Sequence, residues 1–265
     1  MGFRGAIFDV DGVLVDSPHE RAWRETLREL METRWSDVRA DTTYSPERFT
    51  PELYQHLISG KPRMSGARAA LEYFHVPGAE IRADAYAERK QQMVVELIEH
   101  GEFTAFPDAL RFVLAVRDAG IRPAAASSSK NAGLMLGRIR LDTFAEEQGL
   151  EYDFLRPDLS LLDLFDVDIS GRDLAHGKPD PEIFFTAARE LALRPRECFV
   201  VEDAVAGVEA ASAGGIAALG VARADDVELL TAAHADLVVA TLDDVDLDRL
   251  VEGRLASRPA AESNG

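Results

Sequence analysis

The sequence predicts an α/β protein: a doubly wound parallel sheet with an all-helical domain inserted into it. Short apolar runs rich in β-branched residues alternate with helical patterns over most of the chain, as they do in repeated βα units. One long stretch, from about residue 17 to 100, breaks this alternation and shows only helical periodicity. Together these two observations predict a Rossmann-like core that carries a separate helical cap domain.

Five segments have the composition of buried strands: residues 5–10, 121–126, 197–202, 216–221 and 236–240. The second contains Pro123, which cannot donate a hydrogen bond to a neighbouring strand and weakens that assignment. Helices are expected between the strands, at residues 107–119, 181–193 and 204–213. Pro107 and Pro181 suit first helical positions, Asp180 suits an N-cap, and Gly120 suits a helix end.

These elements divide the chain into domains. The core is expected to comprise residues 1–16 and 104–256, and the cap domain residues 17–103, so the two crossings between them could act as hinges. An acidic, irregular segment at 142–177 could fold locally against the site. Residues 257–265 lack periodicity and are expected to be disordered.

Composition narrows the possible partners and compartment. Lys and Arg total 29 and Asp and Glu total 47, giving a net charge of −18. Such a charge repels nucleic acid and anionic lipid, so neither is an expected partner. For the oligomeric state, a monomer is the default expectation. The single cysteine, Cys198, lies in an apolar run and supports no disulfide framework. With no signal-peptide pattern at its start, the chain is expected in the cytoplasm.

Carboxylates follow two of the predicted strands. Asp9 and Asp11 come directly after the first strand, and Glu202 and Asp203 come at the end of the third. In an open α/β sheet these ends lie at the ligand-binding edge. Four carboxylates without histidine or cysteine at ligand spacing suit a hard cation such as Mg²⁺. The plainer alternative for Asp9-Val10-Asp11-Gly12 is a turn in which Asp and Gly only satisfy backbone groups.

Hydroxyl and amino groups are expected near the same edge. Ser127-Ser128-Ser129-Lys130-Asn131 follows the second strand and precedes a helical stretch, a setting in which chains hold phosphate. Lys178 also precedes a helix and could neutralise the same anion. An ordinary N-cap and a solvated lysine are the alternatives. Pro179 follows Lys178 where a nucleotide-binding P-loop needs Ser or Thr, so that motif is excluded.

Taken together, these motifs resemble those of the haloacid dehalogenase superfamily of phosphotransferases. The resemblance spans residues 5–240 and is carried by Asp9 to Ser17, Ser127, Lys178 and the run Val201 to Gly207. Within it, the helical insert resembles the cap of the β-phosphoglucomutase subgroup.

The resemblance implies a role for each motif residue. Asp9 would attack phosphorus and become an aspartyl phosphate, while Asp11 would protonate the leaving oxygen and later deprotonate the acceptor. Lys178 and Ser127 would bind the phosphoryl oxygens. Mg²⁺ would be held by the carboxylates of Asp9, Glu202 and Asp203 and by the backbone carbonyl of Asp11.

Substrate-binding residues are also implied by the resemblance. In the segment from Gly60 to Gly66, Arg63 falls where a mutase arginine grips the far phosphate of a hexose bisphosphate. The other residues at mutase positions are His19, Lys90, Ser128, Lys130 and Asn131. A surface charge for Arg63, a solvated helix residue for Lys90 and a helix-start residue for His19 are the plainer explanations.

The expected activity is therefore Mg²⁺-dependent phosphoryl transfer on a hexose phosphate, as in β-phosphoglucomutase, which converts β-glucose 1-phosphate to glucose 6-phosphate. The alternative is a sugar-phosphate phosphatase with the same site and water as acceptor. Dehalogenation at carbon is disfavoured because dehalogenases lack the second Asp, which is Asp11 here, and need no metal. A non-catalytic sugar-phosphate sensor is disfavoured because every chemical group is present.

Overall fold

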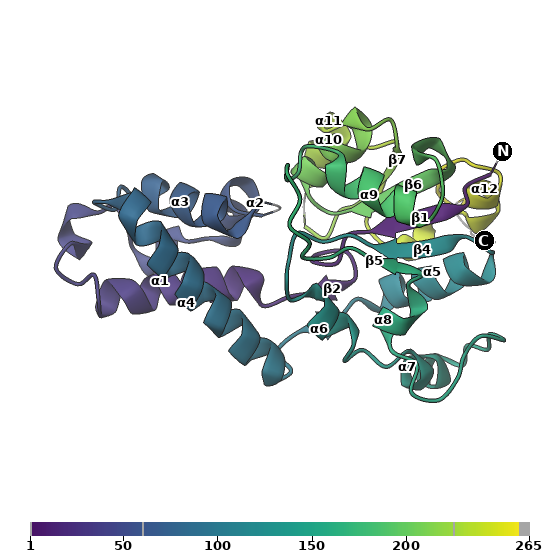
Figure 1. The fold of residues 1–265 in the computed structure, drawn as a ribbon, viewed down its shortest axis with the longest axis horizontal. Coiled ribbons are helices and arrows are strands. Elements are labelled where there is room, and N and C mark those ends of the chain that lie inside the picture. The colour runs from purple at the N-terminus through teal and green to yellow at the C-terminus, as the bar shows by residue number, and fades with distance from the viewer. Residues whose placement is uncertain (1, 60, 225, 260–265) are drawn as a thin grey trace, which may run out of the picture. The chain divides into compact units, whose positions relative to one another are not determined.

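The computed structural model describes residues 2–59, 61–224 and 226–259 (Figure 1). The chain forms two compact units, Met1–Asp16 with Ala105–Gly265 and, separately, Ser17–Thr104. The tail predicted to be disordered starts at residue 257, and this start was wrong: Ser257 forms a β-bridge with Val245, and the Arg258 N–H donates to the Asp244 carbonyl at 2.7 Å. Residues 260–265 of that tail lie outside the described residues.

The first unit is built on a six-stranded parallel sheet with strand order β5-β4-β1-β6-β7-β8. Its strands are β1 (Gly5–Phe8), β4 (Arg122–Ala125), β5 (Val167–Asp168), β6 (Cys198–Glu202), β7 (Ala217–Val221) and β8 (Leu237–Val239). This order, with β1 in the interior, confirms the predicted fold class. All five predicted strands form within their expected ranges, whereas β5 was not predicted because two residues carry no periodic pattern.

Pro123 does not interrupt the ladder in which it lies. The Arg122 N–H donates to the carbonyl of Arg4 at 2.9 Å, on the β1 side of β4. Because alternate residues of a strand direct their N–H groups to the same neighbour, the missing N–H of Pro123 falls on the β5 side. Pairing with β5 begins only at Ala124. The proline therefore removes no hydrogen bond from the centre of the sheet.

Helices cover both faces of this sheet. Alternation along the strands sends Phe8 and Phe199 toward Phe112, with ring centroids 6.1 and 6.4 Å from it. Ile7 and Val200 belong to the apolar cluster formed with the helices of the opposite face. The first face is covered by α5 (Pro107–Asp118), and the second by α9 (Glu182–Glu190), α10 (Val205–Ala213) and α11 (Val227–Ala232).

Shorter elements complete this unit. The segment 142–177 runs from the first turn of α7 to the loop before α9, and it supplies the edge strand β5. The remaining elements are α6 (Ala132–Leu136), α7 (Leu141–Gln148), α8 (Leu161–Leu164), η3 (Pro195–Glu197), η4 (Leu242–Asp244) and α12 (Leu247–Val251).

The second unit is helical and has its own core. It contains α1 (His19–Glu32), η1 (Arg39–Asp41), η2 (Pro46–Arg48), α2 (Pro51–Leu57), α3 (Arg63–Tyr73) and α4 (Ala79–Glu99). Trp23 of α1 meets Tyr86 of α4 edge-on at 4.9 Å, and the Tyr86 hydroxyl donates to the Trp23 carbonyl at 2.8 Å. Satisfying this buried hydroxyl fixes the two long helices against each other.

The chain passes between the units through a two-stranded sheet of β2 (Val15–Asp16) and β3 (Thr104–Ala105). Among the described residues, no helix combines the length and apolar character needed to span a membrane.

Candidate active site

The parallel register brings the predicted site residues to one edge of the sheet. Asp9 directly follows β1, Glu202 is the last residue of β6, and Ser127 lies two residues beyond the end of β4. The Asp9 N–H donates to the carbonyl of Val201 at 3.0 Å, so β1 and β6 stay paired up to the first carboxylate. Because all three strands end on the same side, these side chains share one rim.

Lys178 joins two of the carboxylates. Its Nζ donates to Asp9 Oδ1 and to Glu202 Oε1, each at 2.5 Å. The three residues are at most 7% exposed. Burial alone lowers the pKa of Lys178, but the charges of Asp9 and Glu202 outweigh it and hold the pKa above its ordinary value. The ammonium therefore stays charged beside Asp9.

Glu202 is held from both sides. Its Oε2 accepts the N–H groups of Asp203 at 3.1 Å and Ala204 at 3.2 Å, while Oε1 accepts from Lys178. A Cβ at Gly207 would lie 1.8 Å from Oε1, so only glycine leaves room for this carboxylate. Burial raises the pKa of Glu202 to about 7 despite the opposing effect of Lys178. Gly207 belongs to one of the sequence motifs, but its steric role is visible only in the fold.

Asp203 completes the carboxylate cluster. Asp9, Glu202 and Asp203 each offer an oxygen within 4.8 Å of the others. Burial raises the pKa of Asp203 well above its usual value, and the charges of Glu202, Asp9 and Asp11 raise it further. Gly12 lies against it, with a φ of +83° and room for no Cβ, which would lie 1.9 Å from Asp203 Oδ2.

The donor set fits a hard divalent cation. Within this cluster the carboxylates of Asp9, Glu202 and Asp203 lie beside the Lys178 ammonium, and the pKa of Asp203 is raised first by burial and then by the neighbouring negative charges. Oxygen ligands without a thiolate or imidazole match the preference of Mg²⁺. Asp9, Glu202 and Asp203 are the residues that could hold such an ion through side chains.

Asp11 sits in a closed backbone turn. The carbonyl of Val10 accepts N–H groups from Leu14 and Val15, each at 3.0 Å, and the Gly12 N–H donates to the Val15 carbonyl at 2.8 Å. Asp11 itself is partly exposed. The turn therefore presents this carboxyl group at the rim while its own backbone polar groups are mostly used internally.

The serine loop after β4 folds its hydroxyls onto its own backbone. The buried Ser127 accepts the Ser129 N–H at 3.1 Å, and the Ser129 hydroxyl accepts the Asn131 N–H at 3.2 Å. The sequence predicted that N–H groups of this loop would bind a phosphate at a helix N-terminus, whereas in the structure these two bond to hydroxyls of the loop itself. The helix that follows, α6, has only five residues. The Ser127 hydroxyl keeps its own proton to donate, since it acts here as an acceptor.

The 142–177 segment packs against this loop. The Gly171 N–H donates to the Ser127 carbonyl at 2.9 Å, and a Cβ at Gly171 would lie 2.6 Å from Lys130 Cα. Ser128 is exposed, and the exposed Lys130 pairs with Asp173 at 2.8 Å. This segment therefore supports the serine loop from outside, through the backbone of Gly171.

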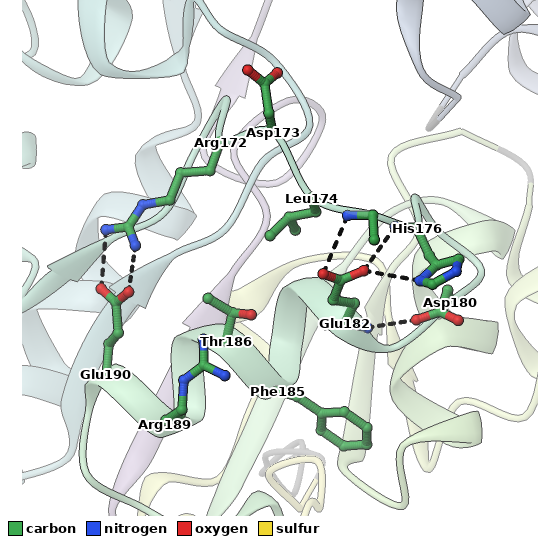
Figure 2. A pocket seen from close by; sticks show the side chains of 11 residues that line it. Arg172, Asp173, Leu174, His176, Asp180, Glu182, Phe185, Thr186, Arg189 and Glu190 are labelled. Atoms are coloured by element: carbon green, nitrogen blue, oxygen red, sulfur yellow. Dashed lines mark hydrogen bonds and ion pairs between the residues drawn. The ribbon is translucent and has the colours of Figure 1, made fainter.

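The loop that carries Lys178 is shaped by its neighbours on either side (Figure 2). Glu182 accepts the N–H groups of Ala175 at 3.2 Å and His176 at 2.7 Å, and Asp180 accepts the Glu182 N–H at 2.9 Å. Pro181, predicted as the first helical residue, is the N-cap of α9, and Asp180, predicted as the N-cap, lies one residue before it. Asp180 still accepts the N–H of Glu182, the first residue of the helix. These bonds close the loop around Lys178.

A pocket of about 630 Å³ lies beside this loop, and Figure 2 shows its lining side chains. His176, Asp180 and Glu182 offer ligand atoms within 4.8 Å of one another there. Their contacts are those that shape the loop, and none of the pocket's lining residues is a predicted site residue.

Three predicted substrate-binding residues belong to the helical unit. Lys90 Nζ lies 3.1 Å from His19 Nδ1, both residues are buried, and the ammonium lies 4.8 Å from the centre of the Trp23 ring. Burial, and then the charge of Lys90, lower the pKa of His19, so a neutral imidazole accepts from the ammonium. Arg63 begins α3 and donates to Gln91 Oε1 at 2.8 Å on the exposed surface. Gly60, in the same predicted loop, lies outside the described residues.

This fold and carboxylate cluster define a class of enzyme. The chain belongs to the haloacid dehalogenase-like hydrolases, whose family pattern matches residues 3–215, and it is an enzyme of that family. The resemblance found in the sequence is thereby confirmed.

Individual proteins of this family that are similar to the chain include mutases and a phosphatase. The chain is 30% identical over 258 residues to the beta-phosphoglucomutase of Mycobacterium bovis, with 90% of each chain covered. It is 27% identical over 255 residues to hexitol phosphatase A of Escherichia coli, covering 96% of this chain and 98% of that one. Among solved structures, the archaeal beta-phosphoglucomutase from Pyrococcus sp. strain ST 04 matches with a TM-score of 0.67 and 27% identity. The match covers 94% of this chain and 97% of that one.

Proposed function

We propose that this protein transfers phosphoryl groups on a hexose phosphate through an aspartyl phosphate on Asp9, with Mg²⁺ as cofactor, and acts as a β-phosphoglucomutase. The observation that supports this most strongly is the buried bridge from Lys178 to Asp9 and Glu202, with Asp203 beside it. A nucleophilic carboxylate held next to a fixed positive charge suits attack on an anionic phosphate.

The residues divide the chemistry in two halves. In the first, an Asp9 oxygen bonds to phosphorus as the ester P–O bond breaks, and Asp11 gives a proton to the departing sugar oxygen. In the second, Asp11 takes the proton of the accepting sugar hydroxyl, whose oxygen attacks the phosphorus and releases Asp9. The hydrogen bonds of the turn fix the main chain from which the Asp11 carboxyl group extends, which suits a group that makes both proton transfers.

Charge compensation completes the proposed mechanism. Lys178 keeps its positive charge beside Asp9, where negative charge from the phosphoryl oxygens gathers. Ser127 offers a hydroxyl proton from the neighbouring strand end. Bound to Asp9, Asp203 and Glu202, with the backbone carbonyl of Asp11, Mg²⁺ would supply further positive charge next to the transferred group.

Assignment as a mutase rests on the relatives and on the helical unit. The beta-phosphoglucomutase of Mycobacterium bovis aligns over 90% of this chain. Arg63, at the start of α3, has the forked donors that suit the second phosphate of a hexose bisphosphate. We assign His19 and Lys90, joined in one buried contact, to the sugar side of the same substrate. Ser128, Lys130 and Asn131 are assigned to its phosphate side.

A second candidate is a sugar-phosphate phosphatase. It is favoured by the match to hexitol phosphatase A, which covers 98% of that enzyme. The two activities share every step up to the aspartyl phosphate and differ only in whether sugar or water accepts the phosphoryl group.

The test records both products from one set of reactions. Purified protein with Mg²⁺ is given a panel of sugar phosphates, and inorganic phosphate is measured beside glucose 6-phosphate formed from β-glucose 1-phosphate with a bisphosphate primer. A mutase forms glucose 6-phosphate with little phosphate release. Phosphate release without isomerisation supports the phosphatase instead. If neither product forms, or if Asp9→Asn leaves the rate unchanged, the proposed chemistry is wrong.

Partners and compartment follow from the same proposal. A small anionic substrate, a monomeric chain and a cytoplasmic location are consistent with the net charge of −18 and with a buried thiol at Cys198. Burial raises the pKa of Cys198 to about 12, so this thiol takes no part in the chemistry.

A further inference from the structure

Arg223 makes a set of contacts that the catalytic proposal leaves unexplained. It follows β7, and its side chain is 17% exposed. Its Nε donates to the Gly12 carbonyl at 3.2 Å and its Nη2 to the Val13 carbonyl at 3.0 Å. Its guanidinium also lies 3.9 Å from the centre of the Phe106 ring. The Arg223 side chain thus contacts both Gly12 and Val13, just after Asp11, and Phe106, just before α5.

The two carbonyls that Arg223 binds lie in the turn that carries Asp11. Within that turn Val10 and Val15 already accept the N–H groups of their neighbours. Arg223 binds the next two carbonyls from outside, one residue beyond Asp11. A planar guanidinium offers donors in a fixed fork, so binding two successive carbonyls restricts the rotation of the turn as well as its position.

Arg223 is itself anchored from the opposite side. Its Nη1 donates to both carboxylate oxygens of Asp108, at 3.1 and 2.8 Å. Asp108 is 7% exposed and also accepts the Thr241 hydroxyl at 3.0 Å and the Leu242 N–H at 2.8 Å. Burial raises the pKa of Asp108, but the hydrogen bonds from Arg223 and Leu242 outweigh it, so the carboxylate stays ionised. The arginine therefore cannot swing freely away from the turn.

We propose that Arg223 is a positioning residue that fixes the turn between Val10 and Val15 so that the Asp11 carboxyl meets the leaving sugar oxygen. This inference rests on the proposed function, since it assigns Arg223 to the proton transfer made by Asp11. It adds a role for a residue that touches neither the phosphoryl group nor the sugar. The sequence offered no signal for it, because an arginine after a strand is most often a solvated charge.

The test separates loss of proton donation from general damage. In single-turnover reactions with enzyme in excess, release of the alcohol reports only transfer from the ester to Asp9. The sugar donor is whichever of β-glucose 1-phosphate, glucose 6-phosphate and glucose 1,6-bisphosphate reacts fastest with the wild-type protein. The second donor is p-nitrophenyl phosphate, whose alcohol leaves as a stable anion and needs no general acid.

Three variants are compared with the wild type. Arg223→Gln removes the fork. Arg223→Gln with Asp108→Asn removes both charges, so that no unpaired carboxylate stays buried if the single variant unfolds. Arg111→Gln is the matched control, because Arg111 makes a similar two-pronged pair, with Asp243 at 2.9 and 2.5 Å, in the same unit.

The expected result is a change in the ratio of the two donors. With Arg223→Gln, and with the double variant, the sugar donor should react at least about 10-fold more slowly, within the range general acid catalysis contributes. Release of p-nitrophenolate should fall by less than about threefold, and Arg111→Gln should keep the wild-type ratio. Equal losses on both donors, or no loss, would overturn the positioning role. A wild-type protein inactive on every ester would instead refute the proposed function.

Discussion

Replacing Gly12 with alanine tests whether the Asp203 carboxylate has to lie where the structure puts it. The new Cβ would lie 1.9 Å from Asp203 Oδ2. To approach the roughly 3.5 Å at which non-bonded heavy atoms meet, the two groups must separate by about 1.5 Å. Displacements of about 1 Å in a catalytic site cost roughly 100-fold in rate, and Mg²⁺ tolerates little distortion of its ligands.

The same substitution also has a backbone cost that needs its own control. Gly12 has a φ of +83°, and alanine in the left-handed region is less stable by about 1–2 kcal/mol. Gly120 has a φ of +77°, and a Cβ there would meet no atom within 4 Å. Gly120→Ala therefore carries a similar backbone cost without touching Asp203.

The assay is phosphoryl-transfer rate as a function of Mg²⁺ concentration, beside urea unfolding of each variant. Gly120→Ala should lose about 1–2 kcal/mol of stability and keep the wild-type Mg²⁺ dependence. Gly12→Ala should lose about 100-fold in kcat/KM and need more Mg²⁺ for half-maximal rate. If the two variants share one Mg²⁺ curve and one rate, Asp203 is not a ligand placed by Gly12.

Three further predictions concern charge. Lys178→Met leaves Asp9 and Glu202 without their shared cation, so urea unfolding of the metal-free protein should show a loss of about 3–5 kcal/mol, and an unchanged midpoint would contradict the bridge. Burial raises the pKa of Glu202 from 4.5 to about 7, so its contribution to folding stability is fully present below about pH 4.5 and is lost as pH rises through about 7. The difference corresponds to roughly 3 kcal/mol, and Glu202→Gln should flatten this part of the metal-free stability curve; a curve that keeps its slope would show that another group titrates. Arg63→Ala should lower mutase turnover by at least about 10-fold while leaving unfolding unchanged, whereas equal activity would show that Arg63 binds no second phosphate.

Local patterns were sufficient for five of the six strands of the parallel sheet and for the helices α5, α9 and α10. The strands around Phe8 and Val200 are buried on both faces, so their sequences are continuous apolar runs bounded by turn residues. Strand β5 was not predicted because two residues, Val167 and Asp168, are too few to show an alternating hydrophobic pattern. It forms because the edge of β4 is available for pairing. Pro123 argued against β4 until the register showed on which side its missing N–H falls.

The chemical groups at the strand ends could be predicted from the chain alone, because each motif is contiguous and strand ends are set by local composition. Asp9 and Glu202 follow predicted strands and Lys178 precedes a predicted helix, so the sequence pointed to all three as candidate site residues. Which of these groups touch depends on the folded chain, since Lys178 is 169 residues from Asp9 along the sequence and reaches it through the packing of α9 on the sheet. The fit of Gly12 against Asp203 and the grip of Arg223 on its turn likewise depend on long-range contacts, which no local pattern encodes.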